Sequence, residues 1–241
     1  MTKAYHDPAF IDSPEARPLR ILAEYLEPRR RLKARGIHRA VTFWGSARIR
    51  PEQVNVGDGR DYYDLARALG RKLAEWTLAE HAPEEQYHIL TGAGPGIMEA
   101  AHAGAAEVDR QRNVGLNISL PFEQGTNRYI PDEQVFDFHY FFTRKFWFLN
   151  LSAALVVFPG GFGTLDELFE VLTLMQTGKA QARPVLLFGS HYWKEVINLP
   201  ALVRQGLIAE ADLDMAIHAD DVDTAFGQLT DALERTHLSW D

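Results

Sequence analysis

The 241-residue sequence contains no cysteine. That absence excludes a disulfide framework and a thiol nucleophile, and nothing points to an oxidising compartment. No apolar run approaches the roughly 20 residues that span a bilayer. The N-terminal residues also lack the pattern of a secretory signal peptide. We therefore expect a cytoplasmic protein that does not bind membranes.

Basic charge is also scarce, because Asp and Glu outnumber Lys and Arg by 33 to 25 and the formal net charge is −8. This balance argues against nonspecific nucleic-acid binding, although a local positive pocket can still hold a small anion. The nine histidines show no metal-ligand spacing and no H-E-x-x-H motif occurs. We therefore predict no metal site.

Apolar, β-branched stretches alternate with helical patterns along the chain, without a break in composition. Strands buried on both faces of a parallel sheet have this continuous apolar character. We predict an α/β fold with a doubly wound parallel sheet of about seven strands and helices on both faces. Residues 1–37 are predicted to form an N-terminal helical extension, and residues 38–241 a single domain. The predicted strands are residues 39–44, 87–91, 113–120, 135–138, 155–158 and 184–188, with a short last strand after residue 212.

A glycine-rich turn follows the strand at residues 155–158 and reads Pro-Gly-Gly-Phe-Gly-Thr over residues 159–164. Thr164 is predicted as the N-cap of a helix over residues 165–178. Free N–H groups at such a helix start bind phosphate, and the helix dipole favours negative charge. A plain capping box between Thr164 and Glu167 is the alternative. Three glycines in four positions exceed what a cap needs, which favours anion binding.

A second glycine turn joins a strand to a helix start at Gly92, Gly94 and Gly96. Ile97 occupies the place of the third glycine of a dinucleotide fingerprint, and no Gly-Lys-Ser/Thr of a P-loop follows. In a doubly wound sheet both turns lie on the same edge, where ligands bind. Glu99 in the first helical turn either pairs with the helix dipole or hydrogen-bonds a sugar hydroxyl.

The first predicted strand ends at the same edge and is followed by Ser46 and Arg48. These two residues are candidate ligand contacts, and a simple turn with a surface arginine is equally consistent with the spacing. A basic cluster at residues 29–31, 33 and 35 is interpreted as a solvated helix face or an interface rather than an anion site.

Arg144 and Lys145 lie in a helical segment that is apolar nearly all round. A buried cation needs an anionic partner. One interpretation is a structural salt bridge or a side chain that snorkels to water. The other is that Arg144 reaches the anion pocket beside the turn at residues 160–164.

Several of these motifs together resemble one protein family, the LOG ("Lonely guy") proteins. Residues 159–167 (PGGFGTLDE) are similar to the family's P-G-G-x-G-T-x-x-E signature, and Arg144-Lys145 to the Arg-Lys pair ahead of it. Residues 92–99 resemble its first glycine turn, with Ala93 as a departure, and residues 45–48 resemble the loop after the first strand. The likeness runs from about residue 39 to residue 220. The extra terminal segments resemble the longer bacterial branch, which an older label calls lysine decarboxylases.

The resemblance implies a function, because LOG proteins are phosphoribohydrolases that activate cytokinins. The substrate is then a nucleoside 5′-monophosphate, AMP-like or a cytokinin ribotide, split into free base and ribose 5-phosphate. The resemblance further implies a Rossmann-like nucleotide-binding catalytic domain, a homodimer or higher homo-oligomer, no cofactor, and Glu167 and Arg144 as the catalytic pair. The residues expected to bind phosphate or nucleotide are Gly160, Gly161, Gly163, Thr164, Gly92, Gly94, Gly96, Ser46, Glu99 and Lys145.

The chemistry of the two catalytic candidates agrees with this implication. Cleavage of an N-glycosidic bond develops positive charge on the ribose, which a carboxylate such as Glu167 can stabilise while it orients or deprotonates a water. Arg144 is always charged and can clamp the phosphate or ribose, or hold Glu167 ionised. Phe162 and Tyr140 are candidates for stacking on the base.

Two alternatives remain open from the sequence. A nucleotide-binding sensor would use the same turns without catalysing a reaction. A pyridoxal-phosphate-dependent lysine decarboxylase would need a Schiff-base lysine, for which Lys145 and Lys179 are weak candidates.

Overall fold

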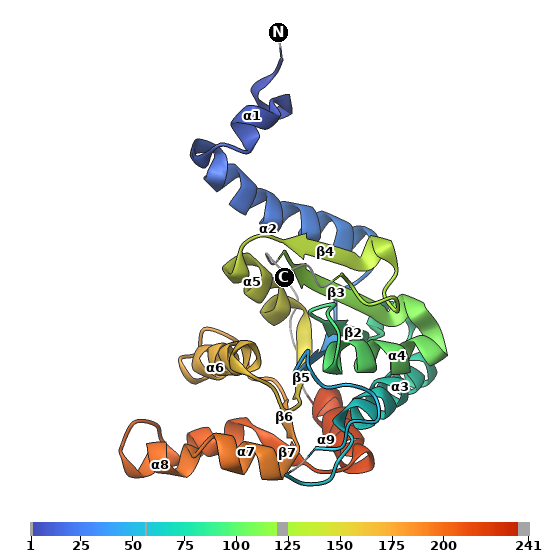
Figure 1. Ribbon diagram of the computed structural model, residues 1–241, viewed down its shortest axis with the longest axis vertical. Coiled ribbons are helices and arrows are strands. Elements are labelled where there is room, and N and C mark those ends of the chain that lie inside the picture. The colour runs from blue at the N-terminus through green and yellow to red at the C-terminus, as the bar shows by residue number, and fades with distance from the viewer. Residues whose placement is uncertain (1, 56, 120–124, 236–241) are drawn as a thin grey trace.

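Seven parallel strands form one sheet in the computed structural model, which describes residues 2–55, 57–119 and 125–235 (Figure 1). The strand order is β4-β3-β2-β1-β5-β6-β7, and each neighbouring pair is parallel. The prediction of a doubly wound α/β sheet is confirmed. The strands are β1 (Ala40–Trp44), β2 (His88–Thr91), β3 (Asn113–Ile118), β4 (Val135–Phe138), β5 (Ser152–Val157), β6 (Val185–Phe188) and β7 (Ile217–Ala219). The predicted end of the third strand, residue 120, lies outside the described residues.

The strand order reverses direction between β1 and β5. The chain first moves outward from β1 to β4 and then returns to place β5 on the other side of β1. The connections leaving β1 and β5 therefore diverge at their carboxyl ends, and this divergence opens a crevice where ligands bind in such sheets. Both glycine turns identified in the sequence start at this edge.

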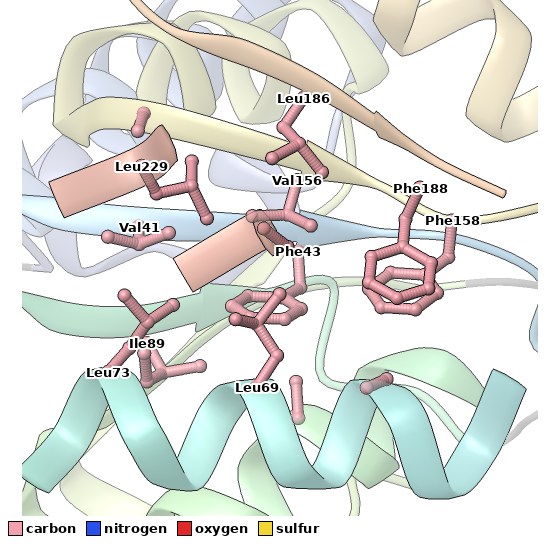
Figure 2. Packing of buried hydrophobic residues seen from close by; sticks show 14 of the residues in the cluster. Val41, Phe43, Leu69, Leu73, Ile89, Val156, Phe158, Leu186, Phe188 and Leu229 are labelled. Atoms are coloured by element: carbon pink, nitrogen blue, oxygen red, sulfur yellow. The ribbon is translucent and has the colours of Figure 1, made fainter. Parts of the chain in front are cut away.

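Helices cover both faces of the sheet, and each face has its own apolar core. One core joins α3 (Tyr62–Glu80), α4 (Ile97–Asp109) and α9 (Val222–Arg235) to the sheet through side chains such as Val41 and Phe43 (Figure 2). The other core uses Ala40 and Trp44 from the same strand, packed against α5 (Phe141–Leu151) and α6 (Phe162–Gln176). Successive side chains of a strand point to opposite faces, so one short strand contributes to both cores.

Helices α3 and α4 approach closely enough for their backbones to touch. A Cβ atom placed on Gly104 would lie 1.8 Å from the carbonyl oxygen of Arg67, and one on Gly70 would lie 2.4 Å from that of Ala101. No side chain larger than hydrogen fits at either position without moving a helix. These two glycines therefore set how α4 sits on α3, and with it the direction in which the second glycine turn faces.

The N-terminal segment packs against β4 and α5 through α2 (Arg17–Ala34). The short helix α1 (Pro8–Ile11) precedes α2. The Glu24 carboxylate accepts hydrogen bonds from the Thr143 hydroxyl at 2.5 Å and from the His139 N–H at 2.8 Å. Arg31 lies over the ring of Phe136 in β4, 4.2 Å from its centroid. The division of the chain at residues 37 and 38 stays a prediction.

The remaining helices follow β6. Two separate helices form here, α7 (Ser190–Val196) and α8 (Leu199–Arg204), and Asn198 caps the second. Among the described residues, no helix is long and apolar enough to span a membrane.

Candidate functional site

A cleft of about 1130 Å³ opens at the carboxyl ends of the central strands. It brings together residues from segments far apart in the sequence, as expected for this edge of a parallel sheet. Of the residues singled out in the sequence, those that line it are Ser46, Arg48, Gly92, Gly94, Arg144, Gly160, Gly161, Phe162, Gly163, Thr164 and Glu167. Those that do not line it are Gly96, Glu99, Tyr140 and Lys145.

The helix after β5 begins three residues earlier than predicted. Gly161 is the N-cap and α6 starts at Phe162, so Thr164 is the third helical residue. The predicted cap at Thr164 and its capping box with Glu167 are wrong. The physical reason is Gly160, where a Cβ would lie 2.2 Å from the Thr164 hydroxyl oxygen, so the glycine lets Thr164 fold back over the turn. The first turn of α6, where N–H groups lack partners within the helix, consequently lines the cleft.

Two contacts hold this turn in place. The Tyr192 hydroxyl donates a hydrogen bond to the Gly160 carbonyl at 2.5 Å. The Ser46 N–H donates to the Pro159 carbonyl at 3.0 Å and so ties the loop after β1 to the turn. A Cβ at Gly161 or Gly163 would meet no atom within 4 Å. These two glycines therefore face open space, where a ligand can reach the backbone.

The second glycine turn braces the first. Gly96 has φ of +72°, and its Cβ would lie 2.2 Å from the Ser46 carbonyl oxygen. The Ile97 N–H donates to that same carbonyl at 3.1 Å. Ala93, the departure from the family pattern, keeps the turn because it adopts φ of 64°, a strained value for alanine. Gly96 thus shapes the cleft from behind instead of lining it.

Arg144 and Glu167 meet at the floor of the cleft. The Arg144 Nη2 lies 3.6 Å from the Glu167 Oε1, and the two side chains are 11% and 15% exposed. Arg144 Nε donates to the Leu116 carbonyl at 2.8 Å, which fixes the guanidinium against β3. A Cβ on Gly92 would lie 2.6 Å from Arg144 Nη2, so this glycine makes room for the arginine.

Burial changes the proton affinities of this pair. It raises the pKa of Glu167 to about 7, even though the neighbouring Arg144 acts in the opposite direction. The same desolvation lowers the pKa of Arg144. Desolvation disfavours the charged form of either group, and here it outweighs their mutual attraction. Arginine nevertheless stays protonated. Glu167 is therefore able to hold or release a proton near neutral pH.

Three predicted contacts point elsewhere. Lys145 Nζ lies 2.8 Å from an Asp166 oxygen and 2.9 Å from a Glu170 oxygen, outside the cleft. Glu99 faces Tyr63, whose pKa it helps to raise after the larger effect of burial. Tyr140 is buried, whereas Phe162 is 92% exposed at the cleft mouth.

Asn117, Asp137 and Tyr192 are among the lining residues that were not identified from the sequence. Asn117 and Asp137 are register partners at the ends of β3 and β4, and the Asn117 amide donates to the Asp137 carboxylate at 2.6 Å. Both lie within predicted strands, near the strand ends that meet at the same edge as the glycine turns, and this position was the available signal. Tyr192 had no such signal, because its contact with Gly160 depends on how α7 folds back.

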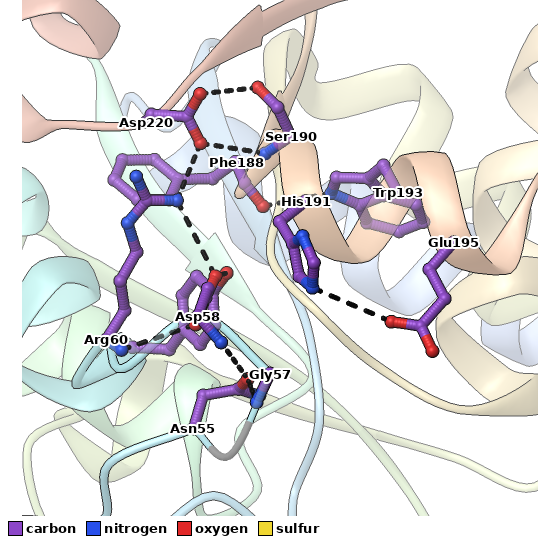
Figure 3. A network of polar contacts seen from close by, with 11 residues as sticks. Asn55, Gly57, Asp58, Arg60, Phe188, Ser190, His191, Trp193, Glu195 and Asp220 are labelled. Carbon is purple, nitrogen blue, oxygen red and sulfur yellow. Dashed lines mark hydrogen bonds and ion pairs between the residues drawn. The ribbon is translucent and has the colours of Figure 1, made fainter.

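A polar network outside the cleft lining joins the loop before α3 to the start of α7 and the residue after β7 (Figure 3). The Arg60 guanidinium lies 2.7 Å from an Asp220 oxygen and 3.5 Å from an Asp58 oxygen. The Tyr62 hydroxyl donates to Asp58, and the Ser190 hydroxyl donates to Asp220 at 2.6 Å. The network fastens the loop before α3 to the end of β7. One guanidinium bridges two carboxylates that also accept hydrogen bonds from hydroxyl groups, which is typical of a structural cluster.

No group of three or more histidine, aspartate and glutamate residues within the described ranges is arranged to hold a metal ion.

Comparison with known proteins gives two kinds of match. A family model described as "Possible lysine decarboxylase" matches residues 98–229. A curated protein from Rhodococcoides fascians, named "Cytokinin riboside 5'-monophosphate phosphoribohydrolase", is 28% identical over 200 residues, covering 79% of this chain and 95% of that protein.

Solved structures extend the likeness at the level of the fold. An X-ray structure of a structural-genomics target is 21% identical with a TM-score of 0.51, over 80% of this chain and 99% of that one. The molybdenum cofactor binding protein from Rippkaea orientalis is 17% identical with a TM-score of 0.51, over 80% of this chain and 96% of that one. At these identities the matches support the Rossmann-like fold alone.

Proposed function

This chain belongs to the LOG family, the one whose model is described as possible lysine decarboxylase, and on that premise we propose that it hydrolyses a nucleoside 5′-monophosphate. The reaction cleaves the N-glycosidic bond and yields the free base and ribose 5-phosphate. The name of the Rhodococcoides fascians relative supports a phosphoribohydrolase activity, with an AMP-like nucleotide or a cytokinin ribotide as substrate.

The observation that carries the proposal is the position of Glu167 relative to the turn. Glu167 lies on the helix whose first turn faces the cleft, and its carboxylate projects beside Arg144. In the proposed complex, N–H groups at residues 161–164 hold the 5′-phosphate, aided by the helix dipole. The ribose then lies between the phosphate and Glu167, with C1′ near the carboxylate.

The proposed reaction uses water as the nucleophile. As the C1′–N bond breaks, its electron pair moves to the base, and positive charge grows on the ribose ring. The Glu167 carboxylate stabilises that charge and takes a proton from the attacking water, whose oxygen bonds to C1′. The departing base takes a proton from solvent, and Glu167 later releases the proton of the water to solvent, so that one water is consumed overall. Arg144 orients Glu167 and contributes positive charge toward the phosphate side.

The decarboxylase alternative has weaker support. It requires a lysine at the reaction centre to form a Schiff base. No lysine occurs among the described residues that line the cleft. Lys145 is paired with two carboxylates outside the cleft, and Lys179 lies at the opposite edge of the sheet. A nucleotide sensor would have the same cleft. It would differ from the enzyme only in binding the nucleotide without hydrolysing it.

A substrate panel tests the proposal. Purified protein is incubated with AMP, GMP, CMP, UMP, isopentenyladenosine monophosphate and adenosine, and the released base is measured by chromatography. We expect base from at least one monophosphate and much less from adenosine, because adenosine lacks the phosphate that the turn binds. Tight AMP binding without any base release would replace the enzyme with the sensor.

The raised pKa of Glu167 predicts a pH dependence. Below pH 7 the carboxylate of the free enzyme is protonated and can neither stabilise positive charge nor accept a proton. We expect kcat/KM for AMP to rise about tenfold per pH unit below pH 7 and to level off above it. The measurement is a pH–rate profile from pH 5 to 9. A profile that is flat between pH 5 and 7 would remove Glu167 from this role.

Exposed aromatic side chains on α5 support the proposed homodimer or larger oligomer. Phe141 and Phe142, adjacent at the start of the helix, are each 54% exposed. Large exposed apolar patches mark interaction surfaces. We expect Phe142→Arg to shift the protein to monomer in size-exclusion chromatography with light scattering. Leu207→Arg, at an exposed apolar residue outside α5, should leave the mass unchanged. A wild-type protein that is already monomeric would contradict the oligomer.

A further inference from the structure

We propose that a second groove, at the opposite edge of the sheet from the cleft, binds a small phosphorylated molecule. The groove encloses about 640 Å³ between α2, the C-terminal half of α5 and the segment before β6. A volume of this size accommodates a nucleotide-sized ligand. The inference is independent of the proposed hydrolase activity, because the groove shares no lining residue with the cleft.

The position of the groove follows from the strands that begin beside it. Its lining includes His38, Leu151 and Arg183, which directly precede or lie close before β1, β5 and β6. The cleft, in contrast, lies where these strands end. Since the strands are parallel, the two sites occupy opposite edges of the sheet, and a ligand in one cannot touch the other.

The charge of the groove is of one sign. Its cationic or protonatable lining residues are Arg29, Lys33, His38, Lys179 and Arg183, and no Asp or Glu lines it among the described residues. The chain as a whole carries a net charge of −8. A concentration of positive groups without compensating carboxylates attracts a multiply charged anion.

The basic cluster of α2 divides between two environments. Arg31 pairs with Glu27 at 3.5 Å, and Arg35 lies 3.9 Å from Glu133. Arg29 and Lys33 turn the other way, into the groove, and make no ion pair with any residue that the structure describes. The interpretation of this cluster as a solvated face therefore fits only part of it.

Hydrogen bonds to the backbone hold the Arg183 side chain in one position in the groove. Its Nη1 donates to the carbonyls of Leu149 at 2.5 Å and Ser152 at 2.7 Å, and its Nε donates to that of Gln181 at 3.3 Å. All three acceptors are backbone carbonyls, so the positive charge is positioned but not neutralised. Burial accordingly lowers the pKa of Arg183. A phosphate in the groove would supply the missing counter-charge.

An aromatic wall stands beside these cations. The Tyr25 ring lies 5.3 Å from that of Phe146 and 5.9 Å from that of Trp147, measured between centroids. All three residues line the groove. Such a surface suits the apolar part of a phosphorylated ligand, while the cations opposite suit its phosphates.

Binding of inorganic tripolyphosphate, measured by isothermal titration calorimetry, tests the site. The groove variant is Arg29→Ala/Lys179→Ala, which removes two exposed cations from separate elements. The matched control is Arg30→Ala/Lys3→Ala, which removes one arginine and one lysine that do not line the groove. All proteins are first compared by thermal melting to establish that they fold alike.

We expect the groove variant to bind tripolyphosphate at least about tenfold more weakly than wild type, since each hydrogen bond to a charged group contributes about that factor or more. The control variant should bind like wild type. Three results would overturn the site: no binding by wild type, equal affinity in the groove variant, or equal weakening in both variants. The second would place the anion in the catalytic cleft, and the third would reduce the effect to overall charge.

Discussion

Glu167→Gln should lower kcat for base release from AMP by about a thousandfold or more. Glutamine keeps the shape of the side chain but carries no negative charge and accepts no proton from water. General-base catalysis and electrostatic stabilisation each contribute roughly two to four powers of ten to such reactions. The measurement is steady-state base release by chromatography, with AMP binding followed separately by calorimetry.

Glu170→Gln is the matched control for this variant. Glu170 lies on the same helix but faces Lys145 outside the cleft. We expect its kcat to stay within about twofold of wild type, because a partly exposed ion pair contributes little. If Glu167→Gln retained full activity while folding and binding AMP normally, the proposed mechanism would have to be abandoned.

Gly104→Ala should lower the stability of the protein more than alanine at any of its other glycines. The new Cβ would lie 1.8 Å from the Arg67 carbonyl oxygen, and both atoms belong to packed helices that cannot yield easily. Overpacking of this kind costs about 3 kcal/mol or more. For a chain of this size we expect Tm to fall by about 6–12 °C, measured by circular dichroism.

Gly227→Ala provides the opposite case. Gly227 lies inside α9, and a Cβ there would meet no atom within 4 Å. Alanine costs less backbone entropy in a helix than glycine, so this variant should gain about 0.5–1 kcal/mol. If the two variants had the same Tm, the close backbone approach of α3 and α4 would not be what limits the size of residue 104.

The fold was predictable because strands buried in a parallel sheet appear in the sequence as short continuous runs of apolar residues. Residues 184–188 were predicted as a strand, and β6 (Val185–Phe188) is buried along its whole length and starts one residue later. The start of α6 was not predictable in detail. Thr164 and Glu167 match a capping box by residue type, whereas the backbone at Gly161 decided where the helix begins.

The site was recoverable in its main parts, and the exceptions have a common cause. Arg144 and Lys145 are adjacent in sequence, but consecutive helical residues point about 100° apart, so only the first reaches the cleft. Asn117 and Asp137 become neighbours only through the order of β3 and β4 in the sheet. A single sequence shows which segments end at the cleft edge, but not which side chains turn into it.

The central position of β1 affects how the chain is made. On the ribosome, β1 can pair with β2 early, as Val41 does with Ile89. Its other edge stays bare until the second half of the chain supplies Ala154 of β5. A bare apolar strand edge is a template for wrong pairing. Chaperone dependence during synthesis should therefore end once β5 has left the ribosomal tunnel, and truncations ending before residue 152 should aggregate.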